Sequence, residues 1–64
     1  MSYVQFIKKL ARHRLEFTTS WDGNYEYYQI YVILSNIEYV INEYDTELME
    51  EVWSQIKLHT GIED

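Results

Sequence analysis

Apolar side chains near the start of the chain recur at three- and four-residue steps, which is the period of a helix with one buried face. Ser2 and Gln5 have the spacing of a capping box at its beginning. Basic residues fall on the other side and in the last turn, where cations favour the helix dipole. The pattern predicts a helix over residues 3–14. Its apolar face consists of Tyr3, Phe6, Ile7, Leu10 and Ala11.

Residues 15–34 change to the two-residue alternation of strands, interrupted by turn residues. Asp22 and Gly23 suit a tight hairpin turn, because both tolerate positive φ. A two-residue loop at this place would pair Phe17 with Tyr28 and bring both apolar rows onto one face. We therefore expect a β-hairpin. The core-facing row of its second strand is Tyr28, Ile30, Val32 and Leu34.

Residues 36–44 fit two interpretations. Ser35 and Glu38 have capping-box spacing, and the apolar positions that follow also suit a helix. The segment is rich in β-branched and aromatic residues, however, and its apolar positions also alternate. A turn at Ser35 and Asn36 would align them with the preceding strand, so we favour a third strand. The expected pairs are Leu34 with Ile37, Val32 with Tyr39, Tyr31 with Val40, Ile30 with Ile41, and Tyr27 with Tyr44.

A second helix is expected over residues 46–59. Asp45 or Thr46 can cap its start, acidic residues occupy its first turns, and Gly61 follows its end. Its buried stripe is Leu48, Met49, Val52, Trp53 and Ile56. The sequence thus predicts one α+β domain over residues 1–64, with the order α-β-β-β-α. A three-stranded antiparallel meander would carry both helices on one face and leave the other face open.

Composition argues against an enzyme. The chain has 64 residues, two histidines and no cysteine. A domain of this size has little room for a catalytic pocket. No cluster of histidine and cysteine suggests a metal site, and two glycines do not make a phosphate-binding loop. We expect no catalytic residue, no metal and no cofactor. The longest apolar run, Ile30–Leu34, is too short to cross a bilayer, and a bacterial cytoplasmic protein is the expectation.

Charge is unevenly distributed along the chain. Residues 1–14 contain four bases and no acid, whereas residues 15–56 contain nine acids and no base. The net charge is −6. Most of the molecule would repel nucleic acid and attract a basic protein surface, although acidity can also serve solubility alone. The candidate partner-binding acids are Glu38, Glu43, Asp45, Glu47, Glu50 and Glu51.

Tyrosines form a second candidate surface on the open face of the predicted sheet. Tyrosine offers a large contact area with few rotatable bonds, so it is common in binding surfaces. An exposed apolar surface of this kind indicates a protein partner or a homodimer. The alternative is that the tyrosines only stabilise the thin sheet through contacts between neighbouring strands. The tyrosines concerned are Tyr25, Tyr27, Tyr31 and Tyr44.

The acidic second half of the chain resembles part of a type II-A anti-CRISPR protein. The likeness rests on the run Glu38-Tyr39-Val40-Ile41, followed by Asn42 and Glu43 and then by the acidic helix through Trp53 and Lys57. The resemblance covers about half the chain. It implies a phage protein that inhibits a nucleic-acid-handling host protein, as Cas9 is inhibited by a mimic of the PAM duplex. No direct contact with nucleic acid is expected.

Overall fold

The computed structural model describes residues 1–63 and confirms the expected order α-β-β-β-α. Within residues 36–44, Ile37–Asn42 form a strand, not a helix. The elements are α1 (Tyr3–Arg12), β1 (Phe17–Asp22), β2 (Tyr27–Leu34), β3 (Ile37–Asn42) and α2 (Thr46–Thr60).

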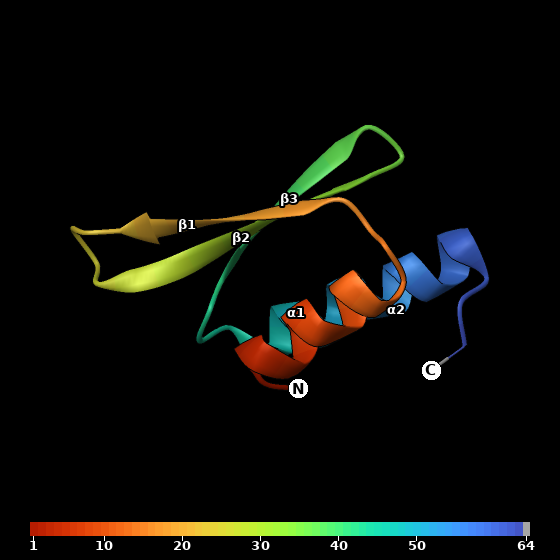
Figure 1. Cartoon of the computed structure of the whole chain (residues 1–64), viewed down its shortest axis with the longest axis horizontal. Helices are drawn as coiled ribbons and strands as arrows, with labels where there is room; N and C mark the ends of the chain where they lie inside the picture. Colours follow the sequence, from red (N-terminus) through yellow and green to blue (C-terminus); the bar gives the residue numbers. More distant parts are fainter. Residues whose placement is uncertain (64) are drawn as a thin grey trace.

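The three strands described in residues 1–63 form one antiparallel sheet in the order β1-β2-β3. Both helices lie on the same side of this sheet, and its other face is open (Figure 1). The β1–β2 turn extends well beyond the helices at one end of the molecule (Figure 1). The helices therefore cover only part of the sheet, and the hairpin end is left outside the core.

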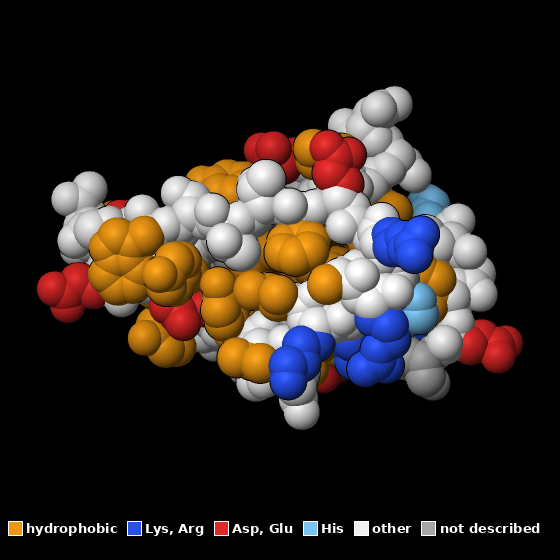
Figure 2. Space-filling model, viewed as in Figure 1, with side chains coloured by type: hydrophobic (Ala, Val, Ile, Leu, Met, Phe, Trp, Pro, Cys, Tyr) orange, Lys and Arg blue, Asp and Glu red, His pale blue; other side chains and the backbone are white. Residues whose placement is uncertain are grey.

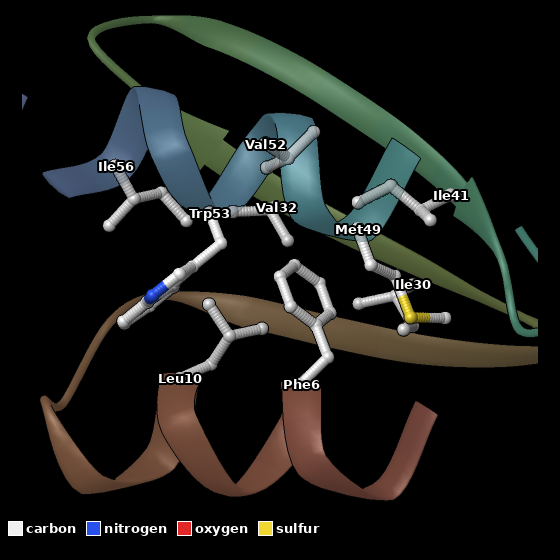
Figure 3. Packing of buried hydrophobic residues seen from close by; sticks show 9 residues of the cluster. All are labelled: Phe6, Leu10, Ile30, Val32, Ile41, Met49, Val52, Trp53 and Ile56. Atoms are coloured by element: carbon white, nitrogen blue, oxygen red, sulfur yellow. The ribbon is translucent and has the colours of Figure 1, made fainter. Parts of the chain in front are cut away.

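The core lies between the helices and the covered part of the sheet. Phe6 and Leu10 point from α1 into the cluster, to which the sheet contributes Ile30 and Ile41 (Figure 3). Burial of these side chains is the main driving force of folding. The fully buried set is Phe6, Leu10, Ile30, Val32, Ile41, Met49, Val52, Trp53 and Ile56.

Both ends of α1 are capped by specific hydrogen bonds. Ser2 and Gln5 form the predicted capping box: the Gln5 N–H donates to Ser2 Oγ, and the Ser2 N–H donates to Gln5 Oε1. At the other end the Arg14 N–H donates to the Ala11 carbonyl and the Leu15 N–H to the Leu10 carbonyl. This is a Schellman motif, and Leu15 is thereby held to the helix instead of entering β1.

The β1–β2 register differs from the sequence prediction. Phe17 pairs with Val32, not with Tyr28, because four residues, 23–26, form the loop where two were expected. Asp22 Oδ1 accepts hydrogen bonds from the Asn24 and Tyr25 N–H groups, and Glu26 takes a positive φ of 58°. These local interactions favour a longer turn. The shift is an even number of residues, so the same side chains still face the helices.

The β2–β3 register agrees with the prediction. Leu34 pairs with Ile37 and Tyr31 with Val40 across a turn at Ser35 and Asn36. Both turn residues have positive φ, 50° and 65°, as the tight turn of a two-residue hairpin requires. The remaining predicted pairs within the ladder, Val32 with Tyr39 and Ile30 with Ile41, are also present.

Two aromatic residues of the hairpin lie outside the core. Trp21 is 53% exposed and Tyr28 is 41% exposed, although both belong to the face that the helices cover elsewhere. The shifted register pairs them with each other near the tip of the hairpin, where Tyr3, the first residue of α1, stacks on Tyr28. Alternation correctly placed Tyr28 in the core-facing row, but it carries no information on how far the helices extend along the sheet.

Candidate protein-binding surfaces

The first candidate surface is the acidic face of α2, defined here as Glu47, Glu50 and Glu51. All three side chains are exposed. Glu47 and Glu51 are one turn apart and lie opposite the buried stripe of the helix, so their carboxylates point to solvent. Neither makes an ion pair or side-chain hydrogen bond with another of residues 1–63. This face therefore offers two free negative charges.

Glu50 lies at the side of this face and is already paired. Its Oε1 is 2.5 Å from the amino group of Met1. The Glu50 side chain is 59% exposed, so solvent screens the pair and its contribution to stability is small. The ion pair ties the start of α1 to α2. It also partly neutralises the charge that Glu50 presents.

Glu43 and Asp45 use their carboxylates within the fold. Glu43 Oε1 accepts a hydrogen bond of 2.8 Å from the Tyr28 N–H, which continues the β2–β3 ladder after β3 ends. Asp45 is the N-cap of α2, and its Oδ1 accepts a hydrogen bond of 3.1 Å from the Leu48 N–H. Both carboxylates thus have a structural role as hydrogen-bond acceptors. The sequence pattern indicated this role only for Asp45, as a helix cap.

Glu38 lies away from the other acids. It pairs with Ile33 near the β2–β3 turn and alternates with Tyr39, whose side chain packs against the core. Its own side chain therefore points to the open face, whereas α2 lies under the other face (Figure 1). The structure does not bring Glu38 together with Glu47 and Glu51 into one acidic edge.

The second candidate surface is the open sheet face, defined here as the side chains of β2 and β3 that point away from the helices, with Tyr25 and Tyr44 at one end. The rings of Tyr25 and Tyr27 stack at 5.6 Å. Tyr44 meets Tyr27 edge to face at 6.4 Å, although β3 ends before it. Tyr25 and Tyr44 are each 70% exposed, so much of this cluster is available to a partner.

The middle of the open sheet face is apolar. Ile33 is 45% exposed and Val40 is 47% exposed, and Tyr31 lies between them at partial exposure. The Tyr31 hydroxyl donates a hydrogen bond of 2.8 Å to Gln29 Oε1, which fixes the ring along the strand. The predicted tyrosines therefore share one face.

A third aromatic group was not identified from the sequence as a surface. Trp21 meets Tyr28 edge to face at 5.0 Å, and Tyr3 stacks on Tyr28 at 6.0 Å. Burial, followed by the charge of Glu43 and by Tyr28, raises the pKa of the Tyr3 phenol above its ordinary value of 10.0. Hydrophobic side chains continue along the hairpin beyond the helices (Figure 2).

Basic side chains gather on α1 (Figure 2). One of them, Lys9, places its Nζ 5.2 Å from the centre of the Trp53 ring, where a cation is attracted to the ring face. The ring of His13 also lies 5.8 Å from that of Trp53. Part of this basic surface therefore covers the core. The acids of α2 and the bases of α1 are on different helices, so charge is separated across the molecule.

Within residues 1–63 no pocket is found, and no group of three acidic or histidine side chains is placed to hold a metal ion. Neither helix in this part of the chain has the length and apolar character needed to span a bilayer. Comparison with protein-family models, curated proteins and solved structures finds no match. Functional inference therefore rests on the surfaces described above.

Proposed function

We propose that the chain is a small acidic inhibitor that binds the basic nucleic-acid site of a larger host protein through the acidic face of α2. The observation that carries this proposal is the pair of free, exposed carboxylates on Glu47 and Glu51. Such charges attract a basic groove and repel nucleic acid itself. The acidic run and the resemblance to type II-A anti-CRISPR proteins favour a phage protein acting in the bacterial cytoplasm as a DNA mimic.

Charge reversal tests the acidic face directly. The double variant Glu47→Lys and Glu51→Lys removes both free carboxylates and leaves the Glu50 contact with Met1 in place. The matched control, Glu16→Lys with Glu63→Lys, makes the same change in net charge at exposed acids outside α2. A specific site requires the first variant to bind at least about tenfold more weakly than the control.

A purified type II-A Cas9 loaded with guide RNA is the first partner to measure. The chain is expected to displace a PAM-containing duplex in a mobility-shift assay, and added salt should weaken the effect because exposed charges are screened. If Cas9 is unaffected, immobilised chain is used to capture proteins from a bacterial lysate. Captured proteins that neither duplex DNA nor salt releases would contradict the DNA-mimic proposal.

The open sheet face supports a second proposal, a non-enzymatic adaptor or structural protein that self-associates through its tyrosines. The observation in its favour is the exposed apolar surface around Tyr31 and Val40. Sedimentation equilibrium would then show a dimer that Tyr27→Ala with Tyr31→Ala abolishes. The control is Leu58→Ser, which removes an apolar side chain that is 78% exposed on α2.

A further inference from the structure

The free edge of β1 carries unpaired backbone groups in a defined order. Tyr28 directs both its N–H and its carbonyl to Glu43, on the β3 side. In an antiparallel ladder the direction alternates with each residue. Trp21, the β1 partner of Tyr28, therefore points its N–H and carbonyl away from β2, as do Thr19 and Phe17. Three residues of β1 thus present both groups along the outer edge.

Natural proteins protect such an edge, but β1 has little protection. Lysine, proline, a bulge or a covering segment commonly prevents edge pairing. β1 pairs with β2 residue for residue over its whole length, so it contains no bulge. Its central residues Thr18, Thr19 and Ser20 are uncharged and exposed. No other strand in residues 1–63 pairs with its outer edge.

The other edge, β3, is partly protected. The same alternation directs the backbone groups of Glu38, Val40 and Asn42 outward. The Asn42 carbonyl, however, already accepts a hydrogen bond of 2.9 Å from the Asp45 N–H, because the chain turns there into α2. Glu38 also places a charge on this strand. Of the two edges, β1 is the one available for a further strand.

We propose that β1 pairs antiparallel with β1 of a second copy about a two-fold axis through Thr19, which joins the two sheets into one. Pairing Thr19 with Thr19 sets Phe17 opposite Trp21 at both ends of the seam. Phe17, Thr19 and Trp21 of each copy then all find backbone partners. Any other two-fold register that keeps both pairs of helices on one side of the joined sheet pairs fewer of these residues. The edge is self-complementary, as a two-fold interface requires.

Side chains across this seam match on both faces. On the helix side, Phe17 lies beside the exposed Trp21 of the second copy, and Thr19 lies beside its own equivalent. On the open side, Thr18 lies opposite Ser20. Aromatic pairs and hydroxyl pairs are both stabilising cross-strand combinations. The seam therefore covers Trp21, which the monomer leaves beyond its helices.

Charge sets the salt dependence of this association. The proposed register places Glu16 opposite Asp22 of the second copy, and each chain carries a net charge of −6. Repulsion between like charges weakens as salt screens it, so added salt should tighten the dimer. Binding through the acidic face of α2 would show the opposite dependence. The inference goes beyond the proposed inhibitor function, and the two can fail independently.

Sedimentation equilibrium over a range of protein concentrations tests the seam. Thr19→Pro removes an N–H that points outward, a position where an edge strand tolerates proline, so the monomer should still fold. Two hydrogen bonds of the seam are lost, and the dissociation constant should rise at least about tenfold. The control Thr19→Val keeps the N–H and should still dimerise. Circular dichroism checks the fold of both variants.

Cysteine pairing tests the register without depending on the proline variant. Thr18 and Ser20 of the second copy form a non-hydrogen-bonded pair about 4.5 Å apart at Cα, which is within disulfide range. The chain has no cysteine of its own. An equimolar mixture of Thr18→Cys and Ser20→Cys chains, oxidised and weighed by mass spectrometry, should therefore give mainly the mixed dimer.

Three results would overturn the proposal. The first is a wild-type chain that stays monomeric at every concentration and salt level measured. The second is a statistical mixture of disulfide products, with about half of them mixed as random collision gives. The third is a dimer that survives Thr19→Pro but is lost in Tyr27→Ala with Tyr31→Ala, because the open sheet face would then be the interface.

Discussion

The backbone conformation of a single residue, Arg14, is a feature that the pattern of apolar and polar side chains does not predict. Arg14 closes the Schellman motif after α1 with a φ of 57°, a region that costs a residue with a Cβ about 1–2 kcal/mol. Its side chain is exposed. The position thus has a conformational requirement that glycine meets better than arginine.

Arg14→Gly should therefore stabilise the protein. Relief of the left-handed strain is partly offset by the entropy of glycine in the unfolded chain, which leaves a net gain of up to about 1 kcal/mol. Urea unfolding followed by circular dichroism measures the change. Arg14→Ala removes the same charge without relieving φ, and equal gains in both variants would contradict the conformational explanation.

Tyr3 gives the stability a pH dependence at high pH. Its folded pKa is raised, so the neutral phenol is favoured in the folded state. The resulting stability is present below the ordinary tyrosine pKa and is lost as pH rises through the folded value.

Tyr3→Phe should accordingly lose less stability between about pH 9 and about pH 11 than the wild type does. Urea midpoints at the two pH values measure this difference. The other six tyrosines are common to both proteins, so the comparison isolates Tyr3. Parallel pH profiles would show that the Tyr3 environment does not influence ionisation.

At the scale of elements, local signals fixed where each helix begins. Ser2 caps α1 and Asp45 caps α2, both at the positions the sequence indicates. Gly61, with a φ of 73°, ends α2 by donating its N–H to the Lys57 carbonyl. Caps depend on residues three or four positions apart, so they are readable without tertiary information.

Asp45→Ala should destabilise the protein by about 1 kcal/mol, because the Leu48 N–H loses its partner. Asp45→Asn keeps a capping oxygen and removes the charge, so it should retain most of the stability. Thermal or urea unfolding compares the three proteins. If Asn is as damaging as Ala, the charge of Asp45 matters more than its hydrogen bond.

The whole molecule has a small core and a limited margin of stability. A domain of this size gains about 3–5 kcal/mol in net stability from its core. The fully buried Phe6 points from α1 into the cluster that side chains of α2 and the sheet complete, as Figure 3 shows. Removing the Phe6 side chain should therefore cost about as much free energy as the whole net stability of the domain.

Phe6→Ala is expected to unfold the isolated chain, because such truncations cost about 3–5 kcal/mol. Circular dichroism and proton NMR dispersion report the loss of structure. Val4→Ala, on the same helix at 55% exposure, is the control and should remain folded. A folded Phe6→Ala protein would mean that the core is better supported than its size suggests.

The sequence by itself determined the capping residues and the side chains of β2 that face the core, and it favoured a strand over a helix at residues 36–44. Those features depend on neighbours or on a two-residue alternation, and the alternation survives even when the β1–β2 register shifts from Tyr28 to Val32 opposite Phe17. Helix 46–59 was likewise recognisable from its stripe alone, and it proved to end one residue later.

Tertiary structure decided which acids are free and how far the core extends. Sequence proximity grouped Glu38 and Glu43 with the acids of α2, but the sheet places Glu38 on the opposite face and Tyr28 takes up the Glu43 carboxylate. The exposure of Trp21 likewise follows from where the helices stop. Such properties arise from packing between segments distant in the chain, which no local pattern encodes.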